Sequence, residues 1–172
     1  MEPTPRLLAA ALSAALLAAC GRADEKANET LVEKAIEASS GQHAKVDLAD
    51  GQQTVTIETE DGTYVATSGD DVRLPDTFPA DVRLPDDGRL ITAMSLGDAV
   101  SVSQRSPRAA ALVFAEFRQA QAALGWVEAG VLEQAPIYVA GFTKDQRRME
   151  ANVVAEADGG TTLAVTVQPR AD

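Results

Sequence analysis

Short runs of alternating apolar and polar residues, separated by turn-forming glycines, constrain the fold of this 172-residue chain more than any other feature. Asp50-Gly51 and Asp61-Gly62 flank one such run at residues 54–59, and Asp158-Gly159-Gly160 separates the last two runs. Glycine adopts the positive φ that tight hairpin turns require, so Asp-Gly between alternating runs is a strong hairpin signal. The pattern predicts an antiparallel sheet built from sequential hairpins.

Residues 30–67 are predicted to form a helix followed by a three-stranded meander. Thr30 and Glu33 fit a capping box, in which two side chains satisfy unpaired N–H groups at the start of a helix. Gly41 is a natural helix stop. Strands are expected at residues 45–48, 54–59 and 63–67. A module of this size buries little apolar surface by itself.

Residues 68–88 are predicted to form a proline-rich linker with an internal repeat. The sequence Asp-Val-Arg-Leu-Pro-Asp occurs at residues 71–76 and again at residues 81–86. Because proline fixes φ, the linker is expected to be extended and stiff. The valine and leucine of each copy are expected to pack onto a neighbouring sheet.

Residues 89–169 are predicted to form a ββαβββ domain. Ser106 and Pro107 mark the start of a helix, with serine as the N-cap and proline at the first helical position, and Gly125 ends it. Strands are expected at residues 90–96, 99–103, 137–143, 147–156 and 161–168, and Trp126 begins the strand after the helix. Across the last hairpin, Leu163, Val165 and Val167 are expected to face Met149, Ala151 and Val153. The whole chain is predicted to have an α+β fold, an N-terminal helix plus β-meander followed by one helix packed on an antiparallel sheet.

The aromatic residues of the second half allow two interpretations. The core face of the second helix is expected to include Val113 and Phe117. Trp126, Tyr138 and Phe142 either join this core, with Trp126 at the seam between helix and sheet, or form an exposed recognition surface. Aromatic residues on strands and at helix ends favour the core.

The charge of the chain is acidic and uneven. It carries 15 Lys and Arg against 26 Asp and Glu, and most of the excess lies between residues 20 and 88. Nucleic acid is excluded as a partner, because its recognition demands a basic face. The acidic half could attract a basic protein or cations; it could also serve only as a solvated surface.

The N-terminal segment, residues 1–19, is predicted to be a secretory signal peptide. Arg6 precedes an uncharged run of Leu, Ala and Ser at residues 7–17. The run is too short to span a bilayer, which takes about 20 apolar residues as a helix. It ends at Cys20, the single cysteine of the chain. An ordinary signal peptide followed by an incidental free thiol is the simpler alternative.

The four residues Leu17, Ala18, Ala19 and Cys20 resemble the lipobox of bacterial lipoproteins. The resemblance implies that Cys20 is acylated, becomes the mature N-terminus and attaches the protein to a membrane. In that family an aspartate directly after the cysteine favours the inner membrane. Gly21 stands there in this chain, which implies the periplasmic face of the outer membrane. Residues 20–29 would form a tether between the anchor and the first helix.

Residues 30–85 resemble the N-terminal module of uncharacterised bacterial lipoproteins. The matching features are the acidic helix ending at Ser40-Gly41, Val46-Asp47, Val55-Thr56-Ile57, Asp61-Gly62, Leu74-Pro75, Phe78-Pro79, Asp81-Val82 and Leu84-Pro85. The region after them resembles the usual partner region of that module, a helix ending in Gly-Trp followed by a strand meander. We associate no activity with the family, so the resemblance implies location and fold only.

No cofactor, metal site or catalytic residue is expected. His43 is the only histidine. With Ser39 or Ser40 it could in principle build a hydrolase triad, but it lies in a loop after a helix, without a nucleophile elbow. A zinc site needs several nitrogen or sulfur ligands, which one histidine cannot supply.

Two groups of charged residues are candidate binding sites. Acidic side chains could bind a cation or a basic partner, and two arginines beside the second helix start could hold an anion. The acidic candidates are Glu58, Glu60, Asp61, Asp70 and Asp71, and the basic candidates are Arg105 and Arg108. Turn formation and solubility are the simpler explanations of these residues.

These observations favour a lipid-anchored lipoprotein of the cell envelope that acts as a non-enzymatic interaction or structural module, with an unknown envelope protein as partner. The alternative hypothesis is an acidic inhibitor or binding protein for a basic envelope enzyme or a cation.

Overall fold

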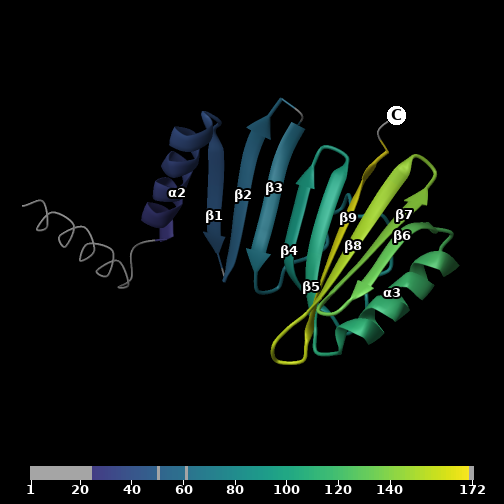
Figure 1. The fold of residues 1–172 in the computed structure, drawn as a ribbon. Coiled ribbons are helices and arrows are strands. Elements are labelled where there is room, and N and C mark those ends of the chain that lie inside the picture. The colour runs from purple at the N-terminus through teal and green to yellow at the C-terminus, as the bar shows by residue number, and fades with distance from the viewer. Residues whose placement is uncertain (1–24, 50, 61, 171–172) are drawn as a thin grey trace, which may run out of the picture.

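The computed structural model describes residues 25–49, 51–60 and 62–170, which form one antiparallel sheet of nine strands with two helices (Figure 1). The predicted lipobox, Leu17 to Cys20, and the candidate residue Asp61 lie outside the described residues. The elements, in chain order, are α2 (Glu25–Ser40), β1 (Ala44–Ala49), β2 (Gln52–Thr59), β3 (Gly62–Gly69), β4 (Arg89–Leu96), β5 (Ala99–Ser106), α3 (Ala110–Ala123), β6 (Val127–Gln134), β7 (Ile137–Lys144), β8 (Arg147–Ala155) and β9 (Thr161–Pro169). Over the described part of the chain, neither helix is long and apolar enough to cross a bilayer.

The strand order is β1-β2-β3-β4-β5-β9-β8-β7-β6. Each strand therefore pairs with its neighbour in the chain, except where β5 pairs with β9. The two segments that we expected as a module and a domain share this sheet, because β3 pairs with β4 from Tyr64 opposite Leu96 to Ser68 opposite Thr92. The fold is mostly β, with α3 on one face of the sheet, which confirms the expected helix-on-sheet arrangement. Four strands follow α3, however, rather than the three of the predicted ββαβββ order.

The core lies between one face of the sheet and α3. In the last hairpin, Met149 lies opposite Val167, Ala151 opposite Val165 and Val153 opposite Leu163, as predicted, and all six side chains are buried. From α3, Phe117 packs edge-on against Phe142, with ring centroids 6.1 Å apart, and Phe114 packs against Tyr138. The aromatic residues of this half are therefore core residues, and Trp126 is also buried.

Residues 70–88, which we call the strap, connect β3 to β4 and pack on the same core. Val72 and Val82, the repeated valines, are 7% and 6% exposed. Leu84 packs against the core, whereas its repeat equivalent Leu74 is 45% exposed. The predicted packing of the repeat is confirmed for three of its four apolar residues, and the strap completes the core rather than only linking its parts.

Both predicted helix starts are wrong. α2 begins at Glu25, so residues 25–29 of the expected tether are helical, and the Thr30 hydroxyl donates to the Lys26 carbonyl instead of capping the helix. α3 begins at Ala110, with Ala109 as the N-cap and no side-chain cap. Ser106 is the last residue of β5; its hydroxyl donates to Asp87 and accepts from the N–H of Arg108, which precedes the helix, so it caps no residue of α3.

Helix α2 lies beside β1, at one edge of the sheet (Figure 1). The backbone N–H groups of Val46 and Leu48 donate to the carboxylates of Glu33 and Glu29, each at 2.9 Å. An edge strand presents unpaired backbone groups to solvent. The two glutamates satisfy such groups on β1, so α2 covers this edge with side chains rather than with another strand.

Candidate functional site

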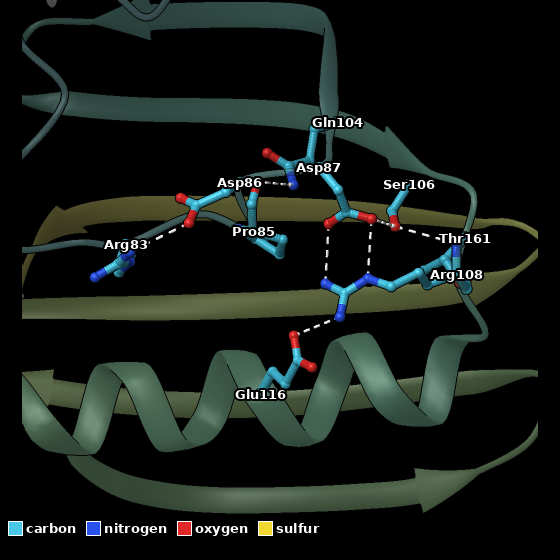
Figure 2. Close-up of polar contacts among 9 residues, drawn as sticks. All are labelled: Arg83, Pro85, Asp86, Asp87, Gln104, Ser106, Arg108, Glu116 and Thr161. Atoms are coloured by element: carbon cyan, nitrogen blue, oxygen red, sulfur yellow. Dashed lines mark hydrogen bonds and ion pairs between the residues drawn. The ribbon is translucent and has the colours of Figure 1, made fainter.

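The strap and α3 line a groove with a volume of about 510 Å³. The residues that line it are Arg83, Leu84, Pro85, Asp86, Asp87, Arg108, Glu116, Phe117 and Ala120. Its apolar residues come from both walls, Leu84 and Pro85 from the strap and Phe117 and Ala120 from α3. Figure 2 shows the charged residues that line it.

An arginine between two carboxylates joins the walls of this groove (Figure 2). Arg108 donates from Nε and Nη2 to the two carboxylate oxygens of Asp87, both at 2.9 Å, and from Nη1 to Glu116 at 2.6 Å. The Ser106 hydroxyl also donates to Asp87, at 2.8 Å. Hydrogen bonds from Arg108 hold the pKa of Asp87 below its ordinary value, and the two carboxylates raise the pKa of Arg108. The charged groups of this network therefore bind one another.

The two arginines predicted to hold an anion belong to separate ion pairs. Arg108 binds Asp87 and Glu116, and Arg105 binds Asp158. The backbone N–H of Gly160, with Arg105, lowers the pKa of Asp158. Each guanidinium is thus already matched by a carboxylate of the chain, which leaves little positive charge for an anion.

The backbone of the strap is held by two buried glutamines. Gln121 of α3 accepts from the Arg83 N–H at 3.3 Å and donates to the Arg83 carbonyl at 2.7 Å. Gln104 of β5 donates from Nε2 to the Pro85 carbonyl at 3.2 Å (Figure 2). Gln121 is fully buried and Gln104 is 2% exposed. Buried amides of this kind must be hydrogen-bonded, and here their partners are strap carbonyls and an N–H group.

A second charged cluster holds the start of the second repeat. Asp81 accepts from Lys144 at 2.7 Å and from both terminal nitrogens of Arg147, at 2.9 and 2.7 Å. The indole N–H of Trp126 donates to the Asp81 carbonyl at 2.7 Å, and the Arg147 guanidinium lies 5.1 Å from the Trp126 ring centroid. Hydrogen bonds from Arg147 and Lys144 hold the pKa of Asp81 well below its ordinary value. Trp126 therefore lies at the seam between α3 and the sheet, as predicted, and also contacts the strap.

The structure does not bring the acidic candidates together. Glu58 and Glu60 lie at the end of β2 where Thr59 pairs with Gly62, whereas Asp70 and Asp71 follow the other end, where Gln52 pairs with Gly69. An eight-residue strand separates these ends by roughly 20 Å. Asp70 accepts from Arg89 at 2.8 Å. Within residues 25–49, 51–60 and 62–170, no three His, Cys, Asp or Glu residues are arranged to hold a metal ion.

His43 is the remaining candidate for acid–base chemistry. Its Nδ1 lies 2.6 Å from a carboxylate oxygen of Glu37, and its side chain is 95% exposed. The hydroxyl of Ser39 donates to the Ile36 carbonyl. Histidine and serine thus have different partners, and the side-chain pair at His43 joins the end of α2 to the following loop.

The comparisons with known proteins give no identity. No family model, curated protein or solved structure matches this chain. The groove residues must therefore be interpreted from their own contacts. Sequence reasoning missed Gln104, Gln121, Asp81 and Asp87 as the residues that hold the strap. For Gln121, the available signal was a polar residue on an otherwise apolar helix face.

Proposed function

We propose that this protein is a lipid-anchored lipoprotein of the cell envelope, attached through Cys20 to the periplasmic face of the outer membrane. The observation that carries the proposal is the run Leu17-Ala18-Ala19-Cys20, placed directly after a charged start and a short apolar segment. Acylation explains a single cysteine in an exported chain. Each buried lipid CH₂ contributes about 0.8 kcal/mol, so a multiply acylated cysteine anchors far better than one chain.

We further propose that the folded part is a non-enzymatic interaction module. The contacts of the groove support this proposal. Arg108, Asp87 and Glu116 bind one another, and they join the strap to α3. Groups engaged in such a network serve to hold the fold, and the apolar surfaces of the sheet remain for binding a partner.

The anchor is tested by the mass and location of the native product in a Gram-negative host. The expected mass is that of a chain starting at Cys20 with its acyl groups, found in the membrane fraction. The Cys20→Ala variant should leave that fraction. A wild-type product with an unmodified thiol or with retained leader residues would contradict the proposal.

A second variant separates the two membranes. Gly21→Asp should redirect the protein to the inner membrane, because aspartate at this position favours retention there in the lipoproteins that the chain resembles. Gly21→Ser is the matched control and should remain in the outer membrane. The two membranes are separated on a sucrose gradient, and identical distributions of the two variants would contradict the proposed location.

A further inference from the structure

The two edge strands of the sheet, β1 and β6, differ in whether their outward backbone groups have hydrogen-bond partners. At β1, side chains of α2 accept hydrogen bonds from the outward N–H groups of Val46 and Leu48. At the other edge, β6 pairs with β7 on one side only, and all eight of its residues are exposed. Among the described residues, no strand or backbone contact satisfies the outer side of β6. Such an edge is a template for another strand.

Three of the exposed side chains of β6 are large and apolar. Val127 is 66% exposed, Leu132 51% and Val131 39%. Leu132 lies opposite Val139, on the sheet face away from α3, and beside it Ile137 lies opposite Val154. Ile137 and Val154 are 46% and 36% exposed, so an apolar surface continues inward from the open edge.

The two carboxylates of β6 share one arginine, which balances half of their charge. Arg118 of α3 donates from Nε to Glu128 at 2.7 Å and from Nη1 to Glu133. These contacts draw both carboxylates to the α3 face of the sheet. A strand added at this edge would meet backbone groups and the apolar surface around Leu132, while the single net negative charge of Glu128, Glu133 and Arg118 lies on the α3 face.

The geometry favours a peptide over a second copy of this chain. A register shift between Glu128 and Gly130 leaves only the second half of β6 as a regular ladder. A stable dimer buries about 800 Å² per partner, which pairing along so short a segment does not supply. An extended peptide needs only main-chain hydrogen bonds and pockets for alternate side chains.

The strand order also favours a peptide over a second copy of the chain. Eight strand spacings separate β1 from β6, roughly 40 Å across the sheet. The helix that follows Cys20 in the chain lies at the β1 edge. The open edge is therefore on the side of the sheet remote from the proposed anchor. A partner segment can approach it there, whereas two copies joined at β6 would have their anchors at opposite ends of one sheet.

We propose that the outer edge of β6 binds an extended segment of a partner protein with apolar side chains at alternate positions, which adds to the sheet as a tenth strand. This inference deepens the proposed function, on which it rests, by naming the surface and the kind of partner. Because Arg118 pairs with both glutamates and leaves a single net negative charge, the binding depends weakly on salt.

The test uses the full chain carrying Cys20→Ala, so that its result does not depend on acylation. The probe is a ten-residue peptide of alternating valine and threonine, with N-methyl groups along one edge so that only the other edge can form hydrogen bonds. A peptide methylated along both edges is the control. Hydrogen exchange of the β6 amides and fluorescence anisotropy measure the binding, in low and high salt.

The one-edge peptide should bind and slow exchange in β6, while the fully methylated peptide should do neither. Leu132→Lys should weaken binding about tenfold or more. The milder Leu132→Thr should weaken it less. Leu112→Lys makes the same change at a residue of α3 that is 61% exposed, and should leave binding unchanged.

Three results would overturn the inference. They are an absence of protection in β6, equal binding of the two peptides, and a dimer in sedimentation that Leu132→Lys converts to a monomer. The last result would assign the edge to a second copy. Loss of peptide binding with a correctly acylated native product would refute the β6 site alone, whereas an unmodified Cys20 with intact peptide binding would refute the anchor alone.

Discussion

The side-chain amide of Gln121 hydrogen-bonds both backbone polar groups of Arg83, accepting from its N–H at 3.3 Å and donating to its carbonyl at 2.7 Å. The amide thus takes the place of a paired strand for one residue of the strap. Because Gln121 is fully buried, water does not replace it without opening the core.

Gln121→Ala should lower the free energy of unfolding by about 2–4 kcal/mol, since it leaves the Arg83 N–H and carbonyl without partners. Gln119→Ala, at an exposed position of the same helix, is the control and should change stability by no more than about 0.5 kcal/mol. Urea unfolding measures both variants. Equal urea midpoints for wild type and Gln121→Ala would show that Gln121 does not hold the strap.

Acid should weaken the attachment of the strap at Asp81. Its pKa in the folded protein is well below the unfolded value of about 3.9, through hydrogen bonds from Arg147 and Lys144. The stabilisation is therefore complete above pH of about 5, and it is lost progressively as the pH falls through the unfolded pKa toward the folded one.

Asp81→Asn should remove this part of the pH dependence and cost about 2 kcal/mol at neutral pH, because two charge-assisted partners lose their carboxylate. Asp71→Asn, the equivalent position in the first repeat, should retain the acid profile. The free energy of unfolding is measured between pH 3 and pH 7. Parallel profiles for wild type and Asp81→Asn would contradict the prediction.

Gly88→Ala should displace Gln104. A Cβ at residue 88 would lie 2.0 Å from Nε2 and 2.4 Å from Cδ of Gln104. Gln104 is buried and donates to the Pro85 carbonyl, so its displacement should cost about 1–3 kcal/mol.

A double-mutant cycle tests whether Gly88→Ala destabilises the protein by displacing Gln104. Gln104→Ala makes room for the added methyl, so the effect of Gly88→Ala should be smaller in that background. Gly141→Ala, where a Cβ meets nothing within 4 Å, is the control and should be close to neutral. If the effects of Gly88→Ala and Gln104→Ala on the free energy of unfolding were additive, the destabilisation by Gly88→Ala would not come from displacing Gln104.

The glutamates of α2 should protect β1 from association. Glu29→Ala with Glu33→Ala removes the acceptors of the Leu48 and Val46 N–H groups, and the double variant should form dimers or larger species. Glu29→Gln with Glu33→Gln keeps an acceptor oxygen at each position and should stay as monomeric as wild type. Sedimentation velocity distinguishes them, and two monomeric double variants would contradict the protective role.

The hairpins could be predicted from the sequence because their signals are local. The alternation of Met149, Ala151 and Val153 and the glycines before β9 are enough to fix which residues face each other across the last hairpin. The repeated valines of the strap could be predicted for the same reason, since a stiff apolar segment must pack against some surface.

The helix starts and the groove could not be predicted, because they depend on distant partners. A serine before a proline resembles a helix cap. Ser106 instead ends a strand, and its hydroxyl donates a hydrogen bond to Asp87, which lies in a different part of the chain. Likewise the sequence around Asp81 is typical of a turn, and only the tertiary structure shows that Lys144 and Arg147 donate to its carboxylate. The strap attachments thus arise only from tertiary contacts.

The pairing of β5 with β9 also has a kinetic consequence. Every other strand pair joins neighbours along the chain. The pairing of β5 with β9 instead requires closure of the loop formed by residues 107–160. The entropy lost in closing a loop grows with its length, so long-range pairings form slowly. We expect two hairpin arrays to form quickly and independently, with their joining along β5 and β9 as the rate-limiting step of folding.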